Sequence, residues 1–234
     1  MYKELVKHGI DVHVLTSGYP LYKRYENMEG IHIHRAYRGG NNHLLLNKLV
    51  TYNISSAYLI TKLIKKYNID IVHGHRFDPF IYASEKRLVK SKIPFILSSH
   101  HTLKGWLKDI ETHATELGIK SNLLRVWLET RETFFFEKLC FNSADLILSL
   151  SKAHREEINM NYGIQREKII PVYNGVDMNI FNPNVNGDEI RKKYGMDNAP
   201  MVLYVGGLGV RKGTMYLIEA ARLVCDAIPD VKFM

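Results

Sequence analysis

Apolar positions along the chain follow two periods, one typical of helices and one typical of strands. Residues 11–16 and 30–34 are short runs of β-branched residues between turn residues, which predicts two strands. The segment 2–9 has the pattern of a final helical stretch that ends at a glycine. Residues 43–67 carry apolar side chains at helical spacing, and the apolar run 69–72 predicts a buried strand after that helix.

The alternation of helix and strand continues through the middle of the chain. In chain order, the predicted elements are a helix at 79–91, a strand at 94–98, a helix at 121–142, a strand at 145–150, a helix at 152–161 and a strand at 168–172. Repeated units of this kind indicate an α/β fold with a parallel, doubly wound sheet. Right-handed crossovers then place the loops that follow the strands along one edge, where such sheets bind ligands.

The composition changes near residue 174 and divides the chain. A polar stretch with a short helix at 188–194 predicts a hinge and linker. An apolar strand at 201–205 then leads through a glycine-rich turn to a helix at 214–228, and residues 231–234 begin another strand. Two strands and one helix do not close a hydrophobic core, so we expect this second domain to be only partly present. The predicted boundaries are 1–173 for the first domain, 174–200 for the hinge and linker, and 201–234 for the second domain.

The overall composition is that of an ordinary globular protein, with 46% hydrophobic and 24% charged residues in 234. No stretch approaches the roughly 20 apolar residues of a membrane span, and the first residues do not begin a signal peptide. Cys140 and Cys225 stand far apart, which predicts neither a disulfide framework nor a zinc knuckle. We therefore expect a cytoplasmic protein.

The formal net charge of +8 favours a negatively charged partner, such as a nucleic acid, an anionic lipid or a phosphorylated small molecule. Nucleic acid is not expected, because the basic residues are scattered and no aromatic RNA-binding signature or helix-turn-helix pattern is present. The segment from Lys104 to Lys108 mixes basic residues with Trp106, which suits an acceptor pocket or an anionic membrane surface.

The glycine-rich turn after the strand at 201–205 is the strongest local motif. Gly206 and Gly207 let the backbone approach a ligand closely, and the free amides at the start of the next helix form an anion site. Arg211 and Lys212 add positive charge there, which predicts phosphate binding. A tight turn with exposed charges is the equally open alternative, since the spacing matches neither a phosphate loop nor a dinucleotide fingerprint.

Histidines follow two of the predicted strands, where this type of fold keeps its binding sites. His75 follows one strand, and the adjacent His100 and His101 follow the next. Imidazoles there can exchange hydrogen bonds with a substrate or stabilise a phosphate. A metal site is not expected, because no Asp or Glu completes a ligand set at a recognisable spacing. Structural roles are expected for the other strand histidines, His13, His32, His34 and His73.

Six segments in this order resemble the family 4 glycosyltransferases, which are retaining enzymes of the GT-B fold. The segments that carry the resemblance are 9–16, 72–75, 94–100, 144–151, 174–183 and 205–213. The resemblance implies two Rossmann-like domains that face each other across a cleft, with the acceptor bound mainly by the first and a nucleoside-diphosphate sugar by the second. It also implies transfer of a hexosyl unit with retention of configuration and no required metal or other cofactor.

The resemblance also suggests roles for individual residues. His100 matches the family's histidine beside the donor sugar and diphosphate, with His101 as the alternative in the register, and both are candidate catalytic residues. Lys212 matches the family's phosphate-binding lysine, where its charge would stabilise the departing nucleoside diphosphate. Substrate binding is expected of His75 and Lys104.

Three departures from the family pattern bear on function. Family members commonly have arginine where Gly207 stands, the first strand and its glycine-rich loop are missing, and the E-x7-E segment would fall beyond Met234. We therefore expect a fragment that is truncated at both ends and inactive alone.

The expected activity of the full-length enzyme is transfer to a lipid-linked, glycan or small hydroxylated acceptor. Two alternatives are a sugar-nucleotide 2-epimerase of the same fold and a non-catalytic sugar-nucleotide-binding module. Peripheral contact with the inner face of the membrane is expected from the basic charge.

Overall fold

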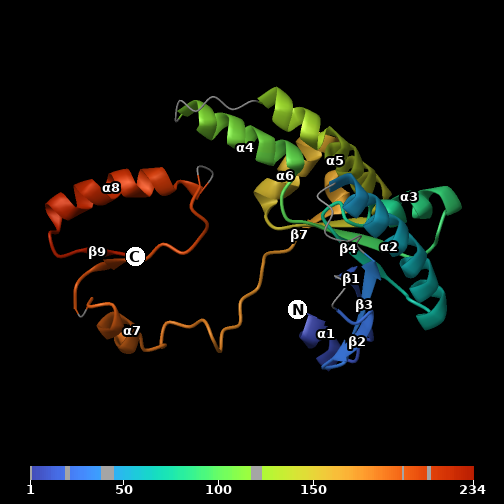
Figure 1. The fold of residues 1–234 in the computed structure, drawn as a ribbon, viewed down its shortest axis with the longest axis horizontal. Coiled ribbons are helices and arrows are strands. Elements are labelled where there is room, and N and C mark those ends of the chain that lie inside the picture. Colours follow the sequence, from blue (N-terminus) through green and yellow to red (C-terminus); the bar gives the residue numbers. More distant parts are fainter. Residues whose placement is uncertain (1, 19–21, 38–44, 117–122, 197, 210–211) are drawn as a thin grey trace.

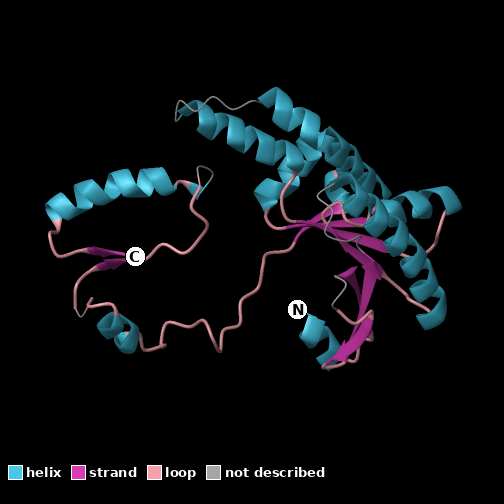
Figure 2. Ribbon diagram, viewed as in Figure 1, coloured by secondary structure: helices cyan, strands magenta, loops and turns pink. Residues whose placement is uncertain are grey.

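The computed structural model describes residues 2–18, 22–37, 45–116, 123–196, 198–209 and 212–234 (Figures 1 and 2). The helices in this part of the chain are α1 (Tyr2–Lys7), α2 (Leu45–Tyr67), α3 (Phe80–Val89), α4 (Leu103–Glu116), α5 (Leu123–Ser143), α6 (Lys152–Tyr162), the 3-10 helix η1 (Arg166–Lys168), α7 (Asp188–Lys193) and α8 (Thr214–Ala227). The strands are β1 (Val12–Gly18), β2 (Tyr25–Met28), β3 (Ile31–Tyr37), β4 (Val72–His75), β5 (Phe95–Ser99), β6 (Leu146–Ser149), β7 (Ile169–Pro171), β8 (Met201–Val202) and β9 (Lys232–Phe233).

The first sheet has the strand order β1-β3-β2. β1 and β3 are parallel, with His13 opposite His32 and Leu15 opposite His34. β2 is antiparallel to β3. The sequence pattern predicted β3 but not β2. Glu29 and Gly30 both have positive φ angles, of 53° and 84°, which is the conformation of a tight two-residue hairpin turn.

The second sheet has the order β4-β5-β6-β7, and all its strands are parallel. This confirms the predicted parallel α/β arrangement. Helices α3 and α5 pack against each other, and α6 packs against β6 and β7. The core under these helices consists of fully buried apolar side chains, among them Phe95, Leu97, Phe141, Ile147, Ile158 and Ile169.

Most predicted elements lie within about two residues of their observed bounds, and three predicted strands differ more. The strand predicted at 69–72 is observed as β4 at Val72–His75, and the one predicted at 30–34 continues as β3 to Tyr37. α4 covers Leu103–Glu116, a segment that the sequence pattern left without a helix. β8 is limited to Met201–Val202, whereas the apolar run predicted a strand to residue 205. Val205 is exposed, so the end of that apolar run is not buried against a sheet.

The C-terminal part contains α7, α8 and the parallel pair β8 and β9. Residues 172–187 carry turns but no helix or strand, and they lead from β7 to this part, which stands apart from the two larger sheets in Figure 1. The domain boundaries after residues 173 and 200 stay predictions. No helix within the described ranges is both long and apolar enough to cross a membrane.

Candidate functional site

The carboxyl ends of β4 and β5 bring three histidines together. His75 Nδ1 lies 3.2 Å from His100 Nε2, and their rings stack with centroids 5.5 Å apart. His73 stacks on His75 at 4.7 Å and shares a 2.8 Å hydrogen bond with the hydroxyl of Ser98. The parallel register places His75 opposite Ser98 and so fixes the spacing of these side chains. Two predicted site residues, His75 and His100, are therefore neighbours.

Gly74 allows β4 to pack at this place. A Cβ atom at Gly74 would lie 2.5 Å from Cγ of Pro79 and 3.0 Å from the ring of Phe95. The first contact is closer than real Cβ atoms show and the second is tight, and neither a proline ring nor a buried phenyl ring moves easily. The glycine between the two histidines of β4 thus has a packing reason.

His73 and His75 favour the neutral form, because the pKa of each is lowered. Partial burial lowers the pKa of His73 and His75, and the nearby His100 lowers both further. Nε2 of His75 lies 3.3 Å from the hydroxyl oxygen of Tyr2, so the ring has a partner at each nitrogen. Neutral imidazoles in such a chain pass hydrogen bonds in one direction from ring to ring.

A pocket of about 230 Å³ opens beside His100 and His101. It lies between the first turns of α4 and α6, and its lining residues are His100, His101, Thr102, Gly105, Trp106, Asp109, Leu150, Ser151, His154 and Glu157. The starts of both helices are the positive ends of their helix dipoles. The pocket thus combines imidazoles with an electrostatic field that favours negatively charged oxygens, such as those of a phosphate.

Thr102 and Glu157 hold the start of α4 against α6. The buried Thr102 hydroxyl donates a short hydrogen bond to Glu157 and accepts the Gly105 N–H at 3.0 Å. A Cβ atom at Gly105 would collide with the Glu157 carboxylate, so a larger residue here would displace that carboxylate from its present position. The Leu103 N–H donates to the buried Glu137 at 3.0 Å, and burial raises the pKa of that carboxyl group.

His154 ties the start of α6 to the end of β5. Its backbone N–H donates to the Ser151 hydroxyl at 3.0 Å, which is the N-cap hydrogen bond of α6. Its Nε2 lies 3.0 Å from the Ser99 hydroxyl, and its Nδ1 lies 3.4 Å from Glu157. This last contact is the largest of the interactions that lower the pKa of Glu157. The pocket wall is therefore a connected polar network.

Lys104 does not join the histidines. Its ammonium group donates to the backbone carbonyl of Asn161 at 2.9 Å and lies over the rings of Phe134 and Tyr162. It is not among the residues that line the pocket. Its predicted role in substrate binding stays a prediction, and its observed contacts join α4 to α5 and α6.

The predicted phosphate-binding residues lie in the separate C-terminal part. Three of them are exposed and lie between β8 and α8, namely Gly206, Gly207 and Lys212. Arg211 lies outside the described residues. The Tyr204 hydroxyl donates to the Gly207 carbonyl at 2.9 Å, and the Lys212 N–H donates to the Gly209 carbonyl at 3.0 Å. A Cβ atom at Gly207 would meet open space, so a larger residue would fit there.

Comparisons with known proteins identify the family and the fold of the chain. The sequence model described as Glycosyltransferase Family 4 matches residues 1–180. The chain belongs to glycosyltransferase family 4. An uncharacterized glycosyltransferase of Methanocaldococcus jannaschii is 27% identical over 92% of this chain and 52% of its own length. This family 4 chain therefore spans about half the length of that relative.

Solved structures show the fold of the family 4 chain. Sucrose-phosphate synthase from Thermosynechococcus elongatus superposes with a TM-score of 0.68 at 18% identity, over 99% of this chain and 53% of its own. Anabaena HepE, solved with UDP and glucose, gives a TM-score of 0.52 at 18% identity, over 88% of this chain and 47% of its own. The fold is the α/β, Rossmann-like GT-B fold, as the sequence predicted.

Several residues around the pocket were missed at the level of sequence. Tyr2, Thr102, His154 and Glu157 were not predicted as site residues, yet they contact the histidines or line the pocket. The spacing Ser151-x-x-His154 at the start of a helix carried a local signal, because serine is a favoured N-cap. The contact of Thr102 with Glu157 carried no such local signal, because the two residues are 55 positions apart in the chain.

Proposed function

We propose that the complete protein transfers a hexosyl unit from a nucleoside-diphosphate sugar to a hydroxylated acceptor, with retention of anomeric configuration. The observation that carries the proposal is the family 4 match over residues 1–180. The acceptor is a lipid-linked, glycan or small hydroxylated molecule. Neither a metal ion nor another cofactor takes part in this transfer.

The donor half of the proposal rests on the C-terminal loop and on a related structure. Anabaena HepE was solved with UDP and glucose, which supports a nucleoside-diphosphate sugar as the partner here. The diphosphate would lie against the backbone of Gly206 and Gly207, with the Lys212 ammonium beside it. As the glycosidic bond breaks, negative charge grows on the departing diphosphate, and a fixed ammonium group stabilises that charge.

His100 would act on the same donor from the first domain. If the Tyr2 hydroxyl donates to Nε2 of His75, then Nδ1–H of His75 donates to Nε2 of His100. That tautomer leaves Nδ1–H of His100 as a donor to an oxygen of the sugar or the diphosphate. His101, which lines the same pocket, is the alternative for this contact.

The pocket between α4 and α6 is the proposed place for the reacting end of the substrates. Trp106 offers an apolar surface and Thr102 lies at the helix start that faces the pocket. The basic surface of the protein would hold it on the inner face of an anionic membrane if the acceptor is lipid-linked. Co-sedimentation with vesicles tests that last point, and binding that is equal for neutral and anionic vesicles would contradict it.

The test of the proposed function is nucleoside-diphosphate release by the complete protein, with and without acceptor. Transfer predicts that nucleoside-diphosphate release depends on the acceptor. Proton NMR of the product would then show the same anomeric configuration as in the donor. An epimerase would change the sugar without any acceptor, and a binding module would bind the donor without turnover. Either of these results would overturn the proposal.

A further inference from the structure

A second group of histidines lies on the first sheet, away from the candidate active site. His13 on β1 and His32 on β3 are opposite each other in the parallel register, and Asp11 precedes β1 by one residue. Because alternate residues of a strand share a face, Asp11 and His13 point to the same side of the sheet. These residues stand at the amino ends of their strands, whereas His75 and His100 stand at or beyond the carboxyl ends of β4 and β5.

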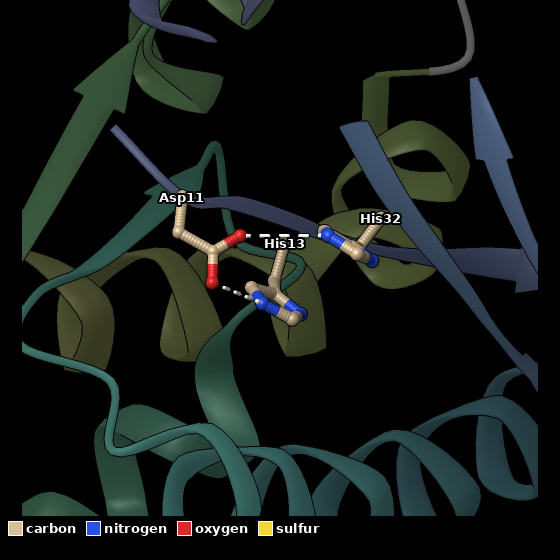
Figure 3. Close-up of side chains that lie close together, drawn as sticks. All are labelled: Asp11, His13 and His32. Carbon is tan, nitrogen blue, oxygen red and sulfur yellow. Dashed lines mark hydrogen bonds and ion pairs between the residues drawn. The ribbon is translucent and has the colours of Figure 1, made fainter. Parts of the chain in front are cut away.

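The side chains of Asp11, His13 and His32 lie close together. Nε2 of His13 lies 3.3 Å from one carboxylate oxygen of Asp11, and Nε2 of His32 lies 3.6 Å from the other. Figure 3 shows the carboxylate on one side of the two stacked imidazole rings, with one dashed line from each of its oxygens to a ring. One nitrogen from each ring and one carboxylate oxygen all lie within 4.8 Å of one another. Two imidazoles and one carboxylate are a ligand set that divalent transition metals accept.

The other nitrogen of each ring already has a partner. Nδ1 of His32 lies 2.7 Å from the hydroxyl of Tyr25, and Nδ1 of His13 lies 3.0 Å from Nε2 of His34. In metal sites, a histidine ligand donates its second N–H to such a partner, which fixes the tautomer with its lone pair toward the ion. Tyr25 and His34 are placed to do this for the two Nε2 atoms that face Asp11.

This group of side chains has one buried member, His13, and one exposed member, Asp11. The side chain of His13 is only 6% exposed, and the ring of Tyr67 from α2 packs on it with centroids 4.2 Å apart. The Asp11 side chain is 67% exposed, so an ion and its water ligands can reach the carboxylate from solvent. The rings of His13 and His32 stack at an interplanar angle of 11°, and both Nε2 atoms face the Asp11 carboxylate.

We propose that Asp11, His13 and His32 bind one divalent transition-metal ion of the Zn²⁺ class, with water in the remaining positions. Tyr25 and His34 are positioning residues that hold the two imidazoles. The ion joins the start of β1 to the start of β3 and so stabilises the first sheet. It takes no part in sugar transfer, because the ligands lie at the opposite strand ends from those that carry the candidate active site.

The test uses Co²⁺ alone as the probe at about pH 7.5, where an ordinary imidazole is neutral. Visible absorption of bound Co²⁺ reports its ligands, and competition with Zn²⁺ gives the relative affinity. The proposal predicts one ion per chain, and a loss of affinity of at least about tenfold in Asp11→Asn and in His13→Ala. Tyr25→Phe should also weaken binding, by about 10-fold, because His32 loses the hydroxyl group that holds its ring.

Two control variants separate this site from chance binding by other histidines. His8→Ala changes an exposed histidine near Asp11 in sequence, and His100→Ala changes the other histidine group. Both should bind Co²⁺ like the native protein. Unchanged binding in Asp11→Asn, or its loss in His100→Ala, would overturn the proposal. Asp11 is exposed, so its variant folds even if His13→Ala does not. Zn²⁺ should raise the melting temperature of the native protein and of both control variants, but not that of Asp11→Asn.

Discussion

Nδ1 of His75 lies 3.2 Å from Nε2 of His100, although the two residues are 25 positions apart in the chain. The parallel pairing of β4 with β5 produces this contact, and the hydroxyl of Tyr2 lies on the far side of His75. His75 is therefore placed to set the tautomer and the orientation of His100. The first prediction follows from this relationship.

In the complete protein, His75→Ala should lower kcat by about 10- to 100-fold, because His100 loses the partner that orients it. His75→Asn should retain more activity, since the asparagine side chain can place a polar atom close to the position of Nδ1. Steady-state kinetics with separate kcat and KM values are the measurement. Equal loss in both variants would show that the hydrogen bond to His100 does not matter.

Lys212→Ala should raise the Kd for a nucleoside diphosphate by about 10- to 100-fold, as expected for a charge-assisted hydrogen bond to phosphate. Isothermal titration with UDP or GDP measures this, and Lys232→Ala is the matched control, an exposed lysine on β9. If both variants bind alike, the glycine-rich loop is only a turn with exposed charges.

Gly207→Arg should fold normally, because a Cβ atom at this position meets nothing within 4 Å. The added guanidinium should strengthen nucleoside-diphosphate binding by up to about fivefold, the range of an exposed ion pair. The melting temperature and the Kd are measured together. Weaker binding would place the diphosphate away from Gly207.

Gly74→Ala should destabilise the protein by about 1–3 kcal/mol, because the new methyl group overpacks against Pro79 and Phe95. Gly175→Ala is the control, since a Cβ atom there meets open space and should change stability by less than about 0.5 kcal/mol. Urea unfolding gives both values. Equal stability of the two variants would mean that β4 can shift without penalty.

His73 should make stability depend on pH. Partial burial lowers its pKa, so the folded state holds it neutral while the unfolded chain takes up a proton below about pH 6.5. Its contribution is therefore complete above about pH 6.5 and declines as the pH falls further. The melting-temperature advantage of the native protein over His73→Gln should shrink between about pH 7.5 and pH 5.5. An advantage that grows toward low pH would contradict the assigned direction.

The parallel sheet β4-β5-β6-β7 was predictable because apolar runs lie in or just before its strands and alternate with helices of clear periodicity. α4 was not, because Gly105 near its start lowers the helical signal. Its start is held by a local hydrogen bond to Thr102 and by a tertiary contact with Glu137. β2 is a short, exposed edge strand whose sequence shows no apolar alternation.

The candidate site shows the same division. His100 was predicted from its place after a strand, and the structure puts it beside His75 and at the pocket. The phosphate-binding role of Lys212, predicted from the glycine-rich turn, stays a prediction. His13 and His32 were assigned structural roles because their nearness depends on the register between β1 and β3, which a single sequence does not display. Glu157 was missed for a similar reason, since its contact with Thr102 requires α4 and α6 to pack.

The most direct test of the account offers the complete protein a panel of nucleoside-diphosphate sugars with hydroxylated acceptors, beside His100→Ala, His101→Ala and Lys212→Ala. The account predicts that one donor is consumed in an acceptor-dependent way, and that Lys212 and one of the two histidines are required. If no donor is bound or turned over, the GT-B fold and family membership stand, but the proposed transfer reaction is wrong.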